Sequence, residues 1–159
     1  IILLNFMTQK RNFYLNIILF IKLALFSIKS IAEADVYLFS SYGSSSVDAM
    51  DFDDSSVYKN LKTSALWTDS YGNYGTEECV GNTQTFNNKI NLIVFCKLTD
   101  QENKDFRVSR HRSSLEGVGG GFSVFIDGDK KYNFLLNKKC NYGVKYIKNH
   151  FWFTQKCKI

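Results

Sequence analysis

The densest group of ionisable side chains in this sequence is the basic cluster Arg107, Arg110, His111 and Arg112. Such a cluster could hold an anion, because guanidinium groups donate paired hydrogen bonds to carboxylate and phosphate oxygens. The same stretch alternates charged with apolar residues, which is typical of a strand with one face in solvent. The sequence favours a solvated strand face, and an anion site is the alternative.

Other signatures of catalysis or metal binding are incomplete. His111 and His150 are the only histidines, and their spacing does not match a zinc site. The glycine-rich stretch 117–121 lacks the Lys-Ser/Thr pair and the helix of a phosphate-binding loop. There is no G-x-S-x-G motif, although a Ser/His/Asp triad assembled in space remains open. We therefore expect no cofactor, no metal and no identifiable catalytic residue.

The four cysteines lie in two stretches with the same hairpin spacing. Cys79 and Cys96 fall opposite each other around 87–88, and Cys140 and Cys157 do so around 148–149. Asn87-Asn88 suits a two-residue turn, because Asn tolerates positive φ. Opposed residues in a non-hydrogen-bonded pair lie about 4.5 Å apart between Cα atoms, within reach of a disulfide. The spacing predicts two structural disulfides, Cys79–Cys96 and Cys140–Cys157, in an oxidised all-β protein.

The first 34 residues have the pattern of an export signal with a few residues upstream of Met7. Lys10 and Arg11 precede an apolar run over 13–28, and an A-x-A site ends at Ala34. A membrane anchor is the rival interpretation, but a spanning helix needs about 20 apolar residues and Lys22 interrupts this run. We predict cleavage after residue 34, no membrane anchor afterwards, and a periplasmic or extracellular location.

Charge and composition narrow the possible functions. Removal of residues 1–34 leaves 16 Lys and Arg against 14 Asp and Glu, so most of the net charge of +5 departs with the signal. The basic character is therefore poor evidence for nucleic-acid binding, and we expect no nucleic-acid partner. Hydrophobic content of 45% indicates a folded domain rather than a disordered chain.

We expect residues 35–62 to form a short strand and a Ser- and Asp-rich loop ahead of a β-barrel domain over 63–159. The acidic residues of this loop do not follow the spacing of a calcium-binding loop, so a solvated acidic loop is favoured. They are Asp48, Asp51, Asp53 and Asp54.

Alternation of apolar and polar residues from residue 63 onward predicts about eight strands and no helix, including a strand through Tyr132, Phe134 and Leu136. An antiparallel meander closed into a barrel removes exposed sheet edges, and a two-sheet sandwich is the alternative. The face that carries the cysteines should point inward. Its other members are Leu92, Val94, Phe122, Val124, Tyr142, Tyr146, Phe151 and Phe153.

Several turn and core motifs resemble those of small exported bacterial barrels. They are Trp67-Thr68-Asp69, Gly72-Asn73-Tyr74-Gly75, Glu78-Cys79-Val80-Gly81, Thr99-Asp100-Gln101, Gly117-Val118-Gly119 and Ile126-Asp127-Gly128 with Lys131-Tyr132. The G-x-G and DG-x-x-x-Y stretches are similar to those of allene-oxide-cyclase and dirigent-type barrels. The resemblance covers about Trp67 to Cys157 and implies a barrel whose lumen holds a hydrophobic ligand. No residue matches the catalytic residues of the plant enzymes, so it implies no activity.

Three classes of function follow. The first is a non-catalytic barrel that binds a small apolar or aromatic ligand in its lumen, since eight strands leave a lumen just wide enough. The second is an interaction or inhibitor module that acts through its loops, and the third is an enzyme. The oligomeric state stays open. The expected ligand contacts are Val94, Tyr142, Tyr146, Phe151 and Phe153.

Overall fold

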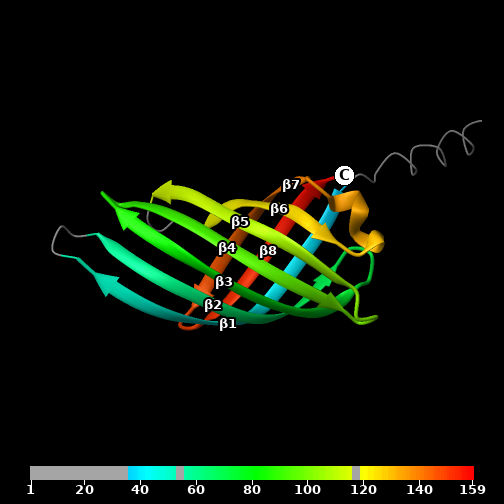
Figure 1. The fold of residues 1–159 in the computed structure, drawn as a ribbon, viewed down its shortest axis with the longest axis horizontal. Helices are drawn as coiled ribbons and strands as arrows, with labels where there is room; N and C mark the ends of the chain where they lie inside the picture. Colours follow the sequence, from blue (N-terminus) through cyan, green and yellow to red (C-terminus); the bar gives the residue numbers. More distant parts are fainter. Residues whose placement is uncertain (1–35, 53–55, 116–118) are drawn as a thin grey trace, which may run out of the picture. The chain divides into compact units, whose positions relative to one another are not determined.

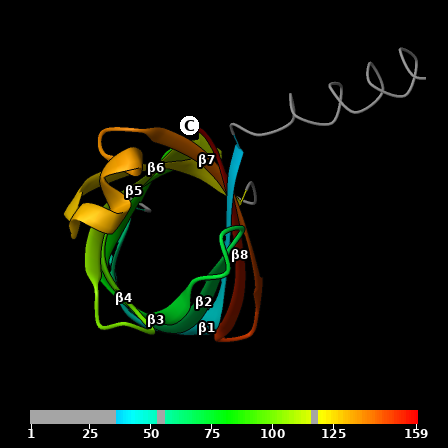
Figure 2. The same ribbon diagram turned by 90° about the vertical axis from the view of Figure 1, so that its right-hand side faces the viewer.

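The computed structural model describes residues 36–52, 56–115 and 119–159, which form eight strands and one 3₁₀ helix. The elements are β1 (Val36–Asp51), β2 (Val57–Asp69), β3 (Tyr74–Phe86), β4 (Lys89–Asp100), β5 (Asp105–Leu115), β6 (Gly120–Gly128), η1 (Lys130–Leu135), β7 (Lys139–Ile147) and β8 (His150–Lys158). Each strand pairs antiparallel with the next, and β1 pairs with β8, which closes a barrel (Figures 1 and 2). The predicted all-β barrel is confirmed, and the sandwich is excluded.

Both predicted disulfides are present, because the hairpin registers are those expected from the sequence. Asn87 and Asn88 have φ of 47° and 60°, and the turn they form sets Cys79 opposite Cys96. The Cα atoms of this bridge lie 4.0 Å apart, and those of the Cys140–Cys157 bridge lie 4.4 Å apart. Bridges that close loops of this length typically stabilise a fold by about 3 kcal/mol each.

The Ser- and Asp-rich front segment belongs to β1, so the expected strand is present but the loop expected to follow it is wrong. β1 pairs with β2 continuously from Phe39↔Asp69 to Asp51↔Val57. The loop interpretation relied on composition, whereas the ladder to β2 satisfies the backbone groups whatever the side chains are. The barrel therefore begins at Val36, and the expected boundary at 62/63 falls inside β2. Asp48 and Asp51 are exposed; Asp53 and Asp54, like the predicted signal over 1–34, lie outside the described residues.

The segment after β6 is η1 rather than the expected strand. The side chain of Asp129 caps its start by accepting a hydrogen bond from the backbone N–H of Lys131, 3.0 Å away. Residues three apart share a face of a 3₁₀ helix. Tyr132 and Leu135 are accordingly both buried, so helical spacing explains the burial that strand alternation does not. No helix among the described residues has the length and apolar character needed to cross a membrane.

The face of β6 that points inward is the opposite of the one expected. Ser123 and Phe125 are buried, whereas Phe122 and Val124 lie on the outer face. The cause is a register shift in the β5–β6 ladder, where Arg107 pairs with Asp127 but the next residue, Val108, pairs with Phe125. A single extra residue reverses which side chains face the core.

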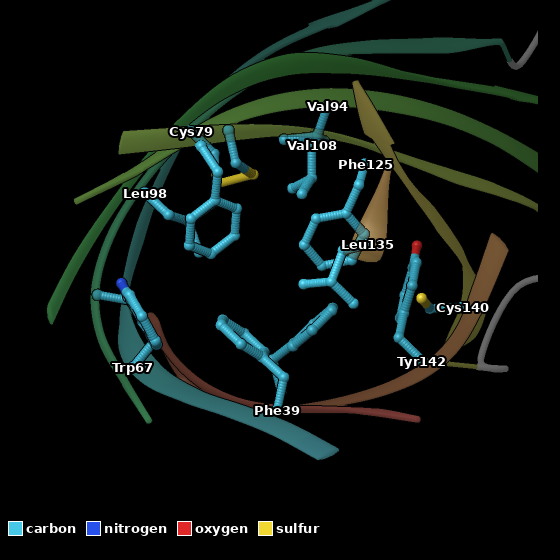
Figure 3. Close-up of a cluster of buried hydrophobic side chains, with 14 of the residues drawn as sticks. Phe39, Trp67, Cys79, Val94, Leu98, Val108, Phe125, Leu135, Cys140 and Tyr142 are labelled. Atoms are coloured by element: carbon cyan, nitrogen blue, oxygen red, sulfur yellow. A yellow bond between two sulfur atoms is a disulfide. The ribbon is translucent and has the colours of Figure 1, made fainter. Parts of the chain in front are cut away.

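Figure 1 shows that η1 and the C-terminus lie at the same end of the barrel. Buried aromatic side chains of the core pack together there. The ring centroids of Phe106 and Tyr132 are 4.2 Å apart, and Phe39 stacks on Trp67 at 5.5 Å. Figure 3 shows Phe39 of β1 and Phe125 of β6 pointing into the interior from different sides of the ring of strands, with Leu135 of η1 beside Phe125. These contacts make this end part of the packed core.

Asp100 fastens η1 to this end of the barrel. Its carboxylate accepts hydrogen bonds from the Tyr132 hydroxyl at 2.7 Å and the Lys131 ammonium at 2.8 Å. It also accepts from the backbone N–H groups of Glu102 and Lys104. Burial alone would raise the pKa of Asp100, but these hydrogen bonds outweigh it and lower the pKa to about 2.

Candidate functional site

A pocket lies inside the barrel, towards the end away from η1. Its volume is about 50 Å³. Its lining residues belong to β2, β3, β4, β5, β7 and β8. They lie in the half of the barrel that contains the β3–β4 and β7–β8 turns. The lining residues are Leu61, Thr63, Cys79, Leu92, Val94, Arg110, Arg112, Tyr142, Val144, Tyr146, Phe151 and Phe153.

All five residues expected to contact a ligand line this one pocket. They are Val94, Tyr142, Tyr146, Phe151 and Phe153. The rings form two pairs, Tyr142 with Phe153 at 4.9 Å and Tyr146 with Phe151 at 6.2 Å between centroids. Tyr146 is 47% exposed while the other four are buried, so Tyr146 marks the mouth and the others the floor. Period-2 alternation along β4, β7 and β8 is what brings them to one side of the barrel wall.

The predicted basic cluster is divided between the two faces of β5. Arg110 and Arg112 point inward and line the pocket. Arg107 forms an exposed ion pair with Asp127 on the outer wall. His111 also lies outside, where it stacks on the Phe122 ring at 5.0 Å between centroids. Strand alternation forces this division, so the four residues do not form one anion site.

The buried partner of Arg110 is Glu77, a residue that the sequence analysis missed. The two guanidinium nitrogens donate to the two carboxylate oxygens of Glu77 at 2.8 and 2.6 Å, and the exposed fractions are 7% and 0%. The Arg110 guanidinium also lies 3.9 Å from the centroid of the Phe153 ring. A usable signal was present, because Glu77 is two residues from the inward Cys79 and therefore shares its face.

Several buried hydroxyl and guanidinium atoms have no hydrogen-bond partner among the described residues. Nε of Arg110 and Oγ1 of Thr63 have no hydrogen-bond partner in the part of the chain that the structure describes, and neither do Oγ of Ser41 and Oγ of Ser123. Buried polar atoms are nearly always hydrogen-bonded to protein, water or ligand. Two of these four atoms belong to residues that line the pocket, so the pocket offers unused hydrogen-bonding capacity.

The two tyrosines of the pocket are neutral hydrogen-bonding groups. Burial raises the pKa of Tyr142 to about 12, although the charges of Arg110 and Arg112 act in the opposite direction. Burial likewise raises the pKa of Tyr146. The Tyr142 hydroxyl donates to the backbone carbonyl of His111 at 3.3 Å. Both side chains can therefore present a protonated phenol to a ligand.

One cluster has the composition of a metal site but not its chemistry. Ligand-type atoms of Glu77, Cys79 and Cys96 lie within 4.8 Å of one another. Both sulfurs are joined in a disulfide, and Glu77 is paired with Arg110. Zinc binds thiolate sulfur, which a disulfide does not provide, so this cluster is not a metal site.

A larger hollow of about 800 Å³ lies against the outer wall of the barrel. Its lining alternates exposed apolar side chains, including Val80, Phe95 and Ile126, with charged ones, including Lys62, Glu78 and Lys97. Ser64 and Glu78 are hydrogen-bonded to each other at 2.7 Å within it. The hollow shares Thr63 and Cys79 with the pocket inside the barrel, but Phe95 is the one aromatic residue among the residues that line it.

The fold and the disulfides define a small, closed, eight-stranded antiparallel barrel that fits an oxidising compartment. No family model matches the chain, and no curated protein matches it. The allene-oxide-cyclase and dirigent resemblance therefore stands at the level of a barrel fold.

Two of the solved structures that share this fold are the following. One is a protein with unknown function from Clostridium acetobutylicum ATCC 824, with 9% identity and a TM-score of 0.65 over 77% of this chain and 99% of that chain. The other is an enzyme from Penicillium herquei, with 14% identity and a TM-score of 0.61 over 76% of this chain and 92% of that one. Sequence identities this low indicate a shared architecture only. They do not indicate that this chain has the activity of the fungal enzyme.

Proposed function

We propose that this protein is an exported binding barrel that takes one end of a small, partly aromatic molecule into the pocket away from η1. The observation that supports this most is the convergence of four aromatic rings, from β7 and β8, on one mixed polar and apolar pocket. Ligand pockets typically combine an apolar lining with a few polar groups that fix orientation. Core side chains such as Phe106, Tyr132 and Leu135 pack together at the opposite end, so we place the entry at the end away from η1.

The size of the pocket limits how the ligand binds. Pockets that enclose a whole drug-sized molecule measure about 300–1,000 Å³, whereas this one measures about 50 Å³. Only one end of a ligand fits there without movement of side chains. The remainder would lie at the mouth, beside the half-exposed Tyr146 and the strands β1 to β4 that extend further at that end (Figure 1).

Export is the second part of the proposal. The disulfides favour an oxidising compartment, and the basic, apolar and A-x-A pattern over 1–34 is that of a signal peptide. A secreted barrel that binds a small molecule would act by carrying or sequestering it. No catalytic residue is assigned.

Blocking the pocket should abolish binding without unfolding the barrel. Val144→Phe adds a ring at the mouth, whereas Lys145→Phe adds the same ring to the exposed outer face of the same strand. Benzamide, at a few millimolar, should raise the melting temperature of the unaltered protein and of Lys145→Phe but not of Val144→Phe. If all three proteins respond alike, or none responds at any soluble concentration, the pocket is not the binding site.

An interaction module is the second candidate, because Val80 and Phe95 pair across β3 and β4 on the outer wall and are 58% and 54% exposed. Exposed apolar side chains that lie together often mark a protein contact. A protein that binds no aromatic fragment, but loses self-association or partner binding on Phe95→Ser, would favour this candidate over the first.

A further inference from the structure

Strand β1 runs on past its neighbour β8 and leaves one backbone edge open. β1 has 16 residues and β8 has 9, and their ladder ends at Ser44↔His150, with one more hydrogen bond from the Ser45 N–H to the carbonyl of Asn149. The ladder from β1 to β2 continues as far as Asp51. Among the described residues, 46–51 therefore pair on one side only, and Figure 1 shows this end of β1 beyond the β7–β8 turn.

The backbone groups that face the open edge can be identified from the last hydrogen bond to β8. The N–H of Ser45 points towards β8, where it meets Asn149. In an antiparallel ladder the N–H and C=O of one residue point to the same side, and the side alternates along the strand. Val47, Ala49 and Asp51 therefore direct their N–H and C=O groups away from β2, out of the open edge. A row of unpaired donors and acceptors of this kind is a template for a further strand.

The side chains along the edge define which strand would fit. Val47 and Ala49 continue the inner face of β1, whereas Asp48 and Met50 lie on its outer face. Asp48 and Asp51 are exposed and form no ion pair among the described residues, not even with the lysines of β2, and β1 itself contains no Lys or Arg. Opposite charges across a ladder stabilise a sheet, and like charges destabilise it. A second copy of β1 would bring the same carboxylates alongside, whereas a strand that carries Lys or Arg would complement them.

We propose that the open edge of β1 binds an extended basic segment of a partner protein, which adds to the sheet as a further strand. In this mode of recognition the backbone hydrogen bonds supply affinity and the alternate side chains supply selectivity. The segment carries Lys or Arg on the outer face, next to Asp48, and apolar residues on the inner face, next to Val47 and Ala49. None of 46–51 lines the pocket inside the barrel, so this inference and the proposed function stand or fall separately.

A short peptide of alternating Lys and Val, with both ends blocked, tests the backbone contact. Fluorescence anisotropy should show that the labelled peptide binds the purified protein in low salt. Two isomers carry N-methyl groups on either the valines or the lysines, so each loses the donors of one peptide edge and keeps its charge and side chains. Because only one edge faces β1, one isomer should bind at least about tenfold more weakly than the parent peptide, and the other about equally. Equal binding of both isomers would reduce the interaction to charge attraction and overturn the proposal, as would no binding of the parent peptide.

Two pairs of variants locate the contact on β1. Ala49→Pro removes a donor of the open edge and spares the ladder to β2, a position where proline is tolerated, and it should weaken the parent peptide at least about tenfold. Ala49→Val keeps the N–H and should change binding by less than about twofold. Asp48→Asn should weaken binding about threefold, whereas Asp127→Asn removes an exposed carboxylate from β6 and should have no effect.

Two outcomes of the variants would overturn the proposal. One is unchanged peptide binding by Ala49→Pro, which would place the contact elsewhere. The other is self-association of the protein that Ala49→Pro abolishes, which would assign the edge to a second copy. The comparison of the two N-methyl isomers uses the unaltered protein and therefore does not depend on the folding of any variant.

Discussion

Replacement of Glu77 by Leu should lower the free energy of unfolding by about 3–5 kcal/mol, because Arg110 would be left charged and buried without its counter-ion. The loss is large because both side chains are buried: the side chain of Glu77 is 0% exposed and that of Arg110 is 8% exposed. The double variant Glu77→Leu with Arg110→Met should recover most of that loss, since a hydrophobic pair avoids the desolvation of both charges. Urea denaturation of the single and double variants measures both effects.

The ion pair between Arg107 and Asp127 is the matched control on the same strand. Its side chains are 64% and 44% exposed, so solvent screens it. Asp127→Asn should change stability by no more than about 1 kcal/mol. A double variant at Glu77 and Arg110 whose loss equals the sum of the two single losses would contradict the account of a coupled buried pair.

Replacement of Asp100 by Asn should be the second most damaging change, with a loss of about 2–3 kcal/mol near neutral pH. The carboxylate accepts from Lys131, Tyr132 and two backbone N–H groups, and an amide oxygen and NH₂ group cannot accept all of these bonds. Because Asp100 is 4% exposed, water cannot replace the lost partners. Loss of these contacts should loosen η1 from the barrel.

The same carboxyl should make stability depend on pH. Its pKa is about 2 in the folded protein, below the usual value of about 4 in an unfolded chain. The stabilisation is therefore fully present above about pH 4 and is lost as the pH falls towards 2. Between pH 2 and 5, the denaturation midpoint of the unaltered protein should fall as the pH falls, and that of the control Asp48→Asn, a change at an exposed residue, should fall equally. The midpoint of Asp100→Asn should fall less steeply. Parallel curves for all three would exclude Asp100 as the source.

Local rules predicted the hairpins because turn chemistry and register are set by neighbouring residues. Asn87-Asn88 fixed the pairing of Cys79 with Cys96 without reference to the rest of the chain. A short front strand was predicted, but its continuation through the Ser- and Asp-rich residues was not, because Ser and Asp are typical of loops whereas pairing with β2 and β8 is a property of barrel closure. Tertiary pairing overrode local propensity here.

The candidate site was partly predictable, because the alternation of side chains along one strand is also a local rule. Alternation along β7 and β8 correctly grouped Tyr142, Phe151 and Phe153, but the shift in β6 reversed the face of Phe122. Treating the basic residues as one cluster ignored that neighbours in a strand point to opposite sides. The contact between Glu77 and Arg110 spans two strands that are not adjacent in the ladder, so no single-strand pattern reveals it.

The most direct test of the binding site is a map of the backbone amide shifts of ¹⁵N-labelled protein during a titration with benzamide. The account predicts that the largest shifts surround Thr63, Arg110, Arg112, Tyr142 and Phe153 on the inner wall. Amides next to Val80 and Phe95 should change little. Shifts centred on that outer hollow, or around η1, would contradict a binding site inside the barrel.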